Sequence, residues 1–167
     1  MARLLANGQL ALLGSQKGIP GVPDYGSVGV WNFATNSLVL YGDHFLNPSA
    51  QQNCVSNIRA FTLTGDRTRI VMGGVGANVD ICTLDPATGQ EMATQSGSGN
   101  FHFILATPDG NSLLIPSSNN STGTIRVFNA RNLTLTSTFA IAGDISSSAT
   151  MMVSPDSKTI YMASAAN

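Results

Sequence analysis

Residues 103–139 read FILATPDGNSLLIPSSNNSTGTIRVFNARNLTLTSTF. Short apolar runs flank the turn sequence Thr107-Pro108-Asp109-Gly110, and alternating apolar residues follow the polar loop behind them. Proline presets the first turn angle and aspartate bonds local backbone, so this turn reverses the chain. The alternation has the period of two that is typical of a half-buried strand. The stretch therefore predicts four short antiparallel strands within about 40 residues.

The same turn recurs along the chain. Its copies are Thr64-Gly65-Asp66, Thr107-Pro108-Asp109-Gly110 and Ser154-Pro155-Asp156-Ser157, with a weaker version at Ala6-Asn7-Gly8. The three aspartates are 43 and 47 residues apart. Because each carboxylate belongs to its own turn, we expect the aspartates to stabilise these turns and not to converge on a metal ion.

An alternating strand that runs into a second turn recurs as well. Its matching positions are Val28, Ile81 and Ile125, then Trp31, Leu84 and Phe128, then Asn32, Asp85 and Asn129. Helical periodicity is hard to find anywhere, and Gly, Pro and Asn or Asp turn signals recur about every 8 to 15 residues. The chain thus reads as tandem units, and each unit contains four strands within about 40 to 60 residues. Such units predict an all-β fold, namely a β-propeller built of four-stranded antiparallel blades.

The repeats predict a single partial propeller over 1–167, with blades at about 2–45, 57–96 and 100–142 and a half blade at 147–167. A propeller of this kind closes with about six to eight blades, so the predicted ring is incomplete. An open blade would expose roughly several hundred Å² of apolar surface, which is more than most soluble monomers tolerate. We favour a fragment of a longer propeller, with a second copy that completes the ring as the alternative. The chain alone is expected to associate or to aggregate.

Residues 154–164, SPDSKTIYMAS, resemble the segment that gives the YVTN-type β-propeller repeat its name. Residues 28–36 and 81–89, VGVWNFATN and ICTLDPATG, are similar to the third strand and hairpin of that repeat. The resemblance covers nearly the whole chain at the level of the repeat. The first unit differs from the repeat pattern, because it has Asn7-Gly8 in place of Pro-Asp. It implies the fold and no particular activity, because propellers carry unrelated functions on one scaffold.

The composition limits the partners that the chain can have. Apolar residues make up 43% of it, charged residues only 10%, and the net charge is −1. This balance gives no electrostatic reason for binding nucleic acid or an anionic membrane. No run of about 18 apolar residues exists, so no membrane span is expected. No signal peptide is visible, but the low charge, the many Ser, Thr and Asn residues and the YVTN resemblance favour a periplasmic or extracellular protein.

The chain has two cysteines, Cys54 and Cys82. We expect two buried or half-buried thiols, and a disulfide is the alternative if the compartment is oxidising. Two cysteines without a nearby histidine are too few for a zinc site. No metal and no cofactor is expected.

Candidate site residues lie seven positions before the turn aspartates, where the first strand of each blade would open on the central channel. They are Arg59 and His102. Both would point toward one opening, and a histidine there can act as an acid, a base or a ligand near neutral pH. The alternative is that both only bond neighbouring loops. Four aromatic residues fit the core between blades better than an exposed stacking platform: Trp31, Phe33, Phe128 and Phe139.

Three functions are compatible with the sequence. The first is a non-catalytic binding or interaction module that holds an unknown protein or small-molecule ligand at the channel mouth. No catalytic residue is assigned, because the sequence shows no nucleophile grouped with a base and an orienting residue. The second is part of an enzyme that resembles the propeller lactonases or the propeller subunits of quinoprotein dehydrogenases, with Arg59 and His102 at its site. The third is a purely structural repeat array.

Overall fold

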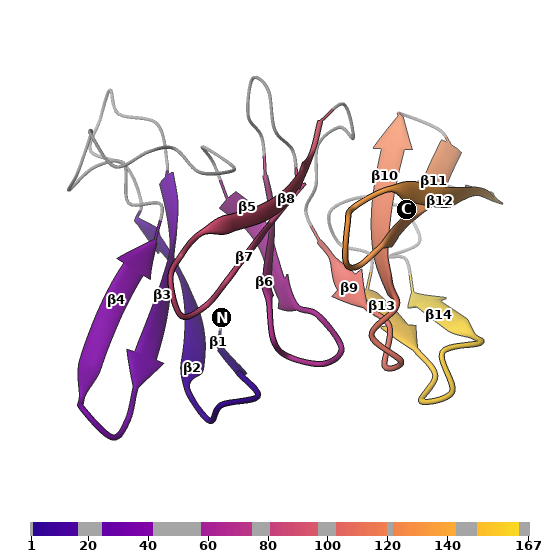
Figure 1. Ribbon diagram of the computed structural model, residues 1–167. Helices are drawn as coiled ribbons and strands as arrows, with labels where there is room; N and C mark the ends of the chain where they lie inside the picture. The colour runs from indigo at the N-terminus through magenta and orange to yellow at the C-terminus, as the bar shows by residue number, and fades with distance from the viewer. Residues whose placement is uncertain are drawn as a thin grey trace.

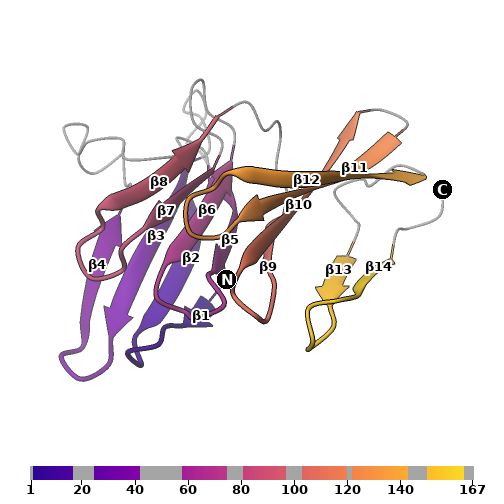
Figure 2. The ribbon, with the colours of Figure 1, turned by 45° about the vertical axis from the view of Figure 1, so that its right-hand side comes forward.

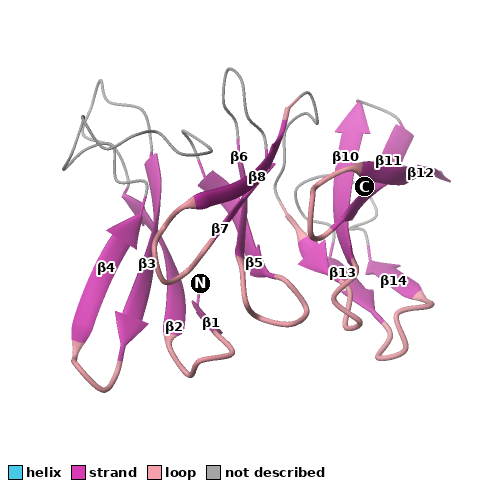
Figure 3. Cartoon of the chain, in the orientation of Figure 1, coloured by secondary structure: helices cyan, strands magenta, loops and turns pink. Residues whose placement is uncertain are grey.

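The structure is a computed structural model that describes residues 2–16, 25–41, 58–74, 81–96, 103–119, 122–142 and 150–163. These residues form fourteen β-strands and no helix (Figure 3). The described part of the chain accordingly contains no helix that could span a membrane. The predicted all-β class is confirmed.

The strands are grouped into three four-stranded sheets and one two-stranded sheet, in which consecutive strands pair antiparallel. The first sheet contains β1 Ala2–Leu4, β2 Leu10–Gln16, β3 Tyr25–Asn32 and β4 Ser37–Tyr41. The second contains β5 Ile58–Leu63, β6 Ile70–Gly74, β7 Ile81–Leu84 and β8 Glu91–Gln95. The third contains β9 Leu105–Ala106, β10 Ser112–Asn119, β11 Thr122–Asn129 and β12 Leu135–Ala142. The fourth contains β13 Thr150–Val153 and β14 Ile160–Ala163.

The four sheets stand side by side in chain order, from the indigo first sheet to the yellow fourth sheet (Figures 1 and 2). The turns that follow β1, β5, β9 and β13 all lie at the same edge of this array (Figure 1). We call this edge the turn end. Such an array of antiparallel sheets that does not close on itself is an incomplete β-propeller, which confirms the predicted architecture.

Each junction between sheets is filled by side chains that alternate along the strands. Because successive residues of a strand point to opposite faces, one strand can serve two cores. In β6, Ile70 and Met72 pack in a core with Val28 of the first sheet, whereas Val71 packs with Ile115 of the third sheet. The described residues form three such cores, one for each pair of neighbouring sheets.

The turns of neighbouring sheets also touch. A Cβ atom added to Gly65 would collide with the Cα of Gly110 and would lie 2.9 Å from the carbonyl oxygen of Thr107. Gly110 has φ +76°, a conformation that favours glycine. Between the first two sheets, the Ala6 N–H donates a 3.1 Å hydrogen bond to the Arg67 carbonyl. The sheets are thus joined at the turn end by backbone contacts as well as by their cores.

The predicted burial of four aromatic side chains is right for one of them. Phe128 is 2% exposed, but Trp31, Phe33 and Phe139 are 38%, 59% and 52% exposed. Trp31 points away from the second sheet, and Phe33, in the following turn, stacks on it with ring centroids 6.0 Å apart. Phe139 lies on β12, the outermost strand of its sheet, whereas the neighbouring fourth sheet has two described strands. Each exposed ring lacks a described sheet to cover it.

Cys82 is fully buried in the core between the first and second sheets, and it is disulfide-bonded. The expectation of a free thiol is therefore wrong for Cys82. Cys54, which is the other cysteine of the sequence, lies outside the described residues.

Candidate functional site

The sequence predicts a polar pocket at Arg59 and His102. Arg59 lies in β5, the first strand of the second sheet, where the pairing with β6 shifts register between Ile58 and Ala60. The structure describes the backbone of Arg59 but not its side chain, and His102 lies outside the described residues. The pocket at the channel mouth therefore stays a prediction.

At the other end of β5, the chain turns through a closed set of hydrogen bonds. The Thr64 hydroxyl donates to Asp66 Oδ1 at 2.5 Å, and the same oxygen accepts the Thr68 N–H at 3.0 Å. The Arg69 N–H donates to Thr64 Oγ1 at 3.2 Å. One hydroxyl and one carboxylate oxygen thus fix the whole turn.

The third and fourth sheets repeat this turn with the same atoms. The corresponding residues are Thr107, Asp109, Asn111 and Ser112, then Ser154, Asp156, Lys158 and Thr159. The predicted turn role of the three aspartates is confirmed. Within the described ranges, no three His, Cys, Asp or Glu side chains come together as metal ligands would.

Hydrogen bonding lowers the pKa of all three turn aspartates. The largest cause of the lowered pKa is the hydroxyl of Thr64, Thr107 or Ser154, and the next is a backbone N–H donated to the same carboxylate. Both donors stabilise the charged form of the carboxylate. The aspartates therefore stay ionised at neutral pH and are poorly suited to general acid–base chemistry.

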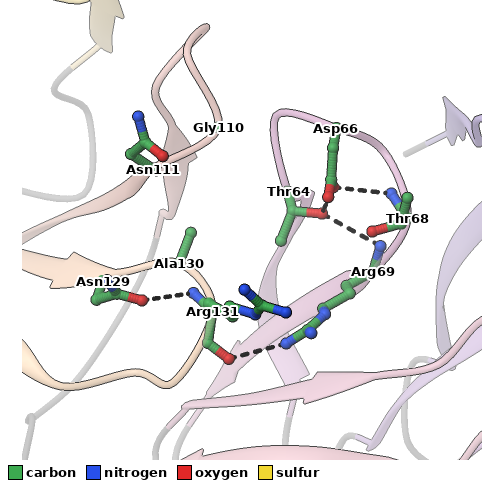
Figure 4. A pocket seen from close by; sticks show the side chains of 9 residues that line it. All are labelled: Thr64, Asp66, Thr68, Arg69, Gly110, Asn111, Asn129, Ala130 and Arg131. Carbon is green, nitrogen blue, oxygen red and sulfur yellow. Dashed lines mark hydrogen bonds between the residues drawn. The ribbon is translucent and has the colours of Figure 1, made fainter.

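A pocket of about 640 Å³ lies at the turn end, where the second and third sheets meet (Figure 4). Its volume is in the range of small-ligand sites. Three turns supply its lining: Thr64, Asp66, Thr68, Arg69, Gly110, Asn111, Asn129, Ala130 and Arg131. We call this the turn-end pocket.

Two arginines give the turn-end pocket its chemistry. Arg69 reaches across the junction, and its Nη1 donates a 2.8 Å hydrogen bond to the Arg131 carbonyl. The loop that carries Arg131 is itself held, because Asn129 Oδ1 accepts the N–H groups of Arg131 and Asn132 at 2.9 and 3.2 Å. Both guanidinium groups are at the pocket in Figure 4.

A guanidinium group has five N–H donors in a planar fork that matches a carboxylate or a phosphate. Arg69 uses one of its donors in the bond to the Arg131 carbonyl, which leaves others for a ligand. The carboxylate of the pocket, Asp66, is already bonded to Thr64 and Thr68. The turn-end pocket can thus bind an oxyanion, and its side chains offer no base or nucleophile that is ready to react.

A second, more apolar pocket of about 470 Å³ lies beside the inner strands β1, β5 and β9. Arg3 and Arg67 line it, together with Thr62 and Leu63 at the turn end of β5. It therefore opens at the opposite end of β5 from Arg59. Sequence reasoning pointed to the other mouth of the channel and missed both pockets at the turn end.

Comparison with known proteins gives a fold and no family. No family model matches the chain. No curated protein matches it either. The resemblance to the YVTN-type repeat therefore stays an expectation from the sequence.

Solved structures do match. A chain in the crystal structure of the Mitotic Checkpoint Complex has a TM-score of 0.63 at 15% identity, over 98% of this chain and 46% of that chain. The acylaminoacyl peptidase of Pyrococcus horikoshii has a TM-score of 0.64 at 10% identity, over 91% of this chain and 25% of that chain. Both likenesses establish a propeller fold alone. The chain spans less than half the length of either structure.

Proposed function

We propose that the chain is a non-catalytic binding module that holds a carboxylate-bearing partner in the turn-end pocket. The observation that carries this proposal is that Arg69 and Arg131 line one pocket across the junction of two sheets. The hydrogen bond from Arg69 Nη1 to the Arg131 carbonyl holds the two residues together. Planar guanidinium groups bind carboxylates in bidentate fashion. Asp66, the carboxylate of the pocket, has a lowered pKa and its hydrogen bonds are taken by its own turn. This favours binding over catalysis.

We propose further that this binding module belongs to an exported or cell-surface protein. Supporting it is the disulfide at Cys82, because disulfides form and persist in oxidising compartments. The low content of charged residues, 10%, agrees with the same assignment.

A calorimetric titration of the protein with a hexaglutamate peptide tests the binding function. Arg131→Gln should weaken binding about tenfold or more, since a hydrogen bond to a charged group contributes about 1.5–3 kcal/mol. Lys158→Gln is the matched control, because it removes the same charge from a turn of the fourth sheet that does not line the pocket. Equal losses for the two variants, or no binding by the parent chain, would contradict the proposal.

The competing function is part of a propeller enzyme whose site includes Arg59 and His102. It rests on the sequence resemblance and would place the ligand at the other end of the channel. His102→Ala separates the two functions. Binding of hexaglutamate should survive this change if the ligand lies in the turn-end pocket, and its loss would favour the channel mouth.

A further inference from the structure

The face of the first sheet that points away from the second sheet is apolar. One row of direct cross-strand partners runs through all four of its strands: Leu4, Leu10, Trp31 and Leu38. Directly opposed residues share a face of the sheet, so these side chains form a continuous strip. Leu4, Trp31 and Leu38 are 51%, 38% and 52% exposed. We call this strip the first-sheet free face.

The same positions are buried in the next two sheets. The pair Leu10 and Trp31 corresponds in register to Ile70 and Leu84, and to Leu113 and Phe128. None of these four counterparts is more than 2% exposed. Each pair packs in the core that its sheet shares with the preceding sheet. The repeat therefore shows what covers such a face, namely the opposite face of a sheet of the same kind.

The fourth sheet has an exposed face as well, and this face points away from the third sheet. Met152 and Tyr161 are direct partners on the face that points away from the third sheet, and they are 64% and 60% exposed. The counterparts of Tyr161 on β6 and β10 are Val71 and Leu114, which are 0% and 3% exposed. Both pack against the following sheet. We call Met152 and Tyr161 the fourth-sheet free face.

The two free faces are thus the two sides of one contact that the chain already makes at each of its internal junctions. They lie at opposite ends of the array of sheets, so they do not meet within one chain (Figures 1 and 2). We propose that the first-sheet free face is the docking surface for the fourth-sheet free face of a second copy of this chain. The contact is head to tail, and such contacts generate rings or open chains.

The wild-type chain reports on this contact through its own fluorescence. Trp31 is the one tryptophan of the sequence and lies on the first-sheet free face. Docking covers the indole ring, so its emission should move to shorter wavelength as the protein concentration rises, in step with a larger species in sedimentation velocity. A monomer with constant emission over the whole concentration range would overturn the proposal, and would leave these faces to a sheet of another protein or of a longer chain.

Two charge variants test the head-to-tail geometry. Leu4→Glu disables the first-sheet free face and Tyr161→Glu disables the fourth-sheet free face, and each variant keeps the other face intact. Because a buried unpaired charge is strongly unfavourable, each variant alone should associate about tenfold or more weakly than the parent. An equimolar mixture has one intact junction and should form a species of two copies. If the Tyr161→Glu chain associated as the parent does, the contact would be symmetric and the proposal wrong.

Met92→Glu is the matched control, since Met92 is 47% exposed on the outer strand of the second sheet, away from both free faces. It should associate like the parent. Circular dichroism shows whether each variant keeps the β spectrum, and Met152→Glu replaces Tyr161→Glu if the latter does not fold. A mixture that stays monomeric although both of its components are folded would also overturn the proposal.

Discussion

One acceptor oxygen at a fixed position closes the turns that follow β1, β5, β9 and β13, which we call the inner turns. In the first turn, Asn7 Oδ1 accepts the Gln9 N–H at 3.0 Å, as the aspartates do in the later turns. Leu5 stands where Thr64 stands in the second sheet, and its side chain is buried in the core instead of bonding the turn. The carboxamide suffices for the turn, which explains why Asn7 can stand where the three later turns have Asp.

Replacing Asp109 by Asn should make the protein less sensitive to acid. The Thr107 hydroxyl and the Asn111 N–H lower the pKa of Asp109 in the folded state. A carboxyl with a lowered folded pKa stabilises the fold above its unfolded pKa of about 4, and this stabilisation is lost as the pH falls through the folded pKa. Asp109→Asn keeps an acceptor for Asn111 and removes that titration.

Urea unfolding over a series of acidic pH values measures the effect of Asp109→Asn. The midpoint of the variant should fall less steeply with decreasing pH than that of the parent. Asp66→Asn should behave in the same way, because the Thr64 hydroxyl lowers the pKa of Asp66 likewise. Parallel curves for all three proteins would show that these carboxyls do not couple to folding.

Gly65→Ala should destabilise the protein, although Gly→Ala changes at permitted backbone conformations usually stabilise by about 0.4–1 kcal/mol. The added Cβ would collide with the backbone of Gly110, which cannot move aside as a flexible side chain can. Overpacking of this kind costs about 1–3 kcal/mol. The measurement is the free energy of unfolding in urea, and a stabilised variant would mean that the second and third sheets are not in contact there.

At the scale of single elements, the sequence predicts the strands well because their signals are local. The alternation in β11 and the turn after β9 are each contained in a few residues. The pairing irregularities are different. β7 and β8 shift register between Thr83 and Leu84, and β11 and β12 shift between Val127 and Phe128, whereas β3 and β4 pair without a shift. The alternation of one strand does not mark a bulge, because a bulge is an extra residue relative to the partner strand.

Equivalent positions in different sheets should differ in their effect on stability. Leu114 and Tyr161 occupy the same place in β10 and β14, but Leu114 is 3% exposed and Tyr161 is 60% exposed. Leu114→Ala leaves a cavity and should cost about 2–5 kcal/mol of unfolding free energy. Tyr161→Ala should cost about 0.5 kcal/mol or less in the monomer.

Denaturant unfolding of the Leu114→Ala and Tyr161→Ala variants at low protein concentration compares the two positions without association. A loss at Tyr161 as large as the loss at Leu114 would mean that the face carrying Tyr161 is already covered in the monomer. The two free faces would then need a different explanation.

At the scale of the whole molecule, sequence reasoning predicts the repeat but not what each repeat touches. Trp31 and Phe128 match in register, so the sequence assigns both to the core, yet among the described strands only Phe128 has a neighbouring sheet on that side. The sequence does not predict the turn-end pocket for a related reason. Arg69 and Arg131 are 62 residues apart, and they meet only because one follows an inner turn and the other lies in an outer turn of the next sheet.

Successive sheets of this protein stand side by side, and the inner turns of the second and third sheets are in contact. An NMR measurement of the nuclear Overhauser effect between the Hα protons of Gly65 and Gly110 checks this arrangement, since a Cβ on Gly65 would overlap the Gly110 backbone. We predict a strong cross-peak between these two residues, which lie in different sheets. Its absence, in a folded sample whose turns each show their own internal contacts, would mean that the second and third sheets do not stand side by side in this way.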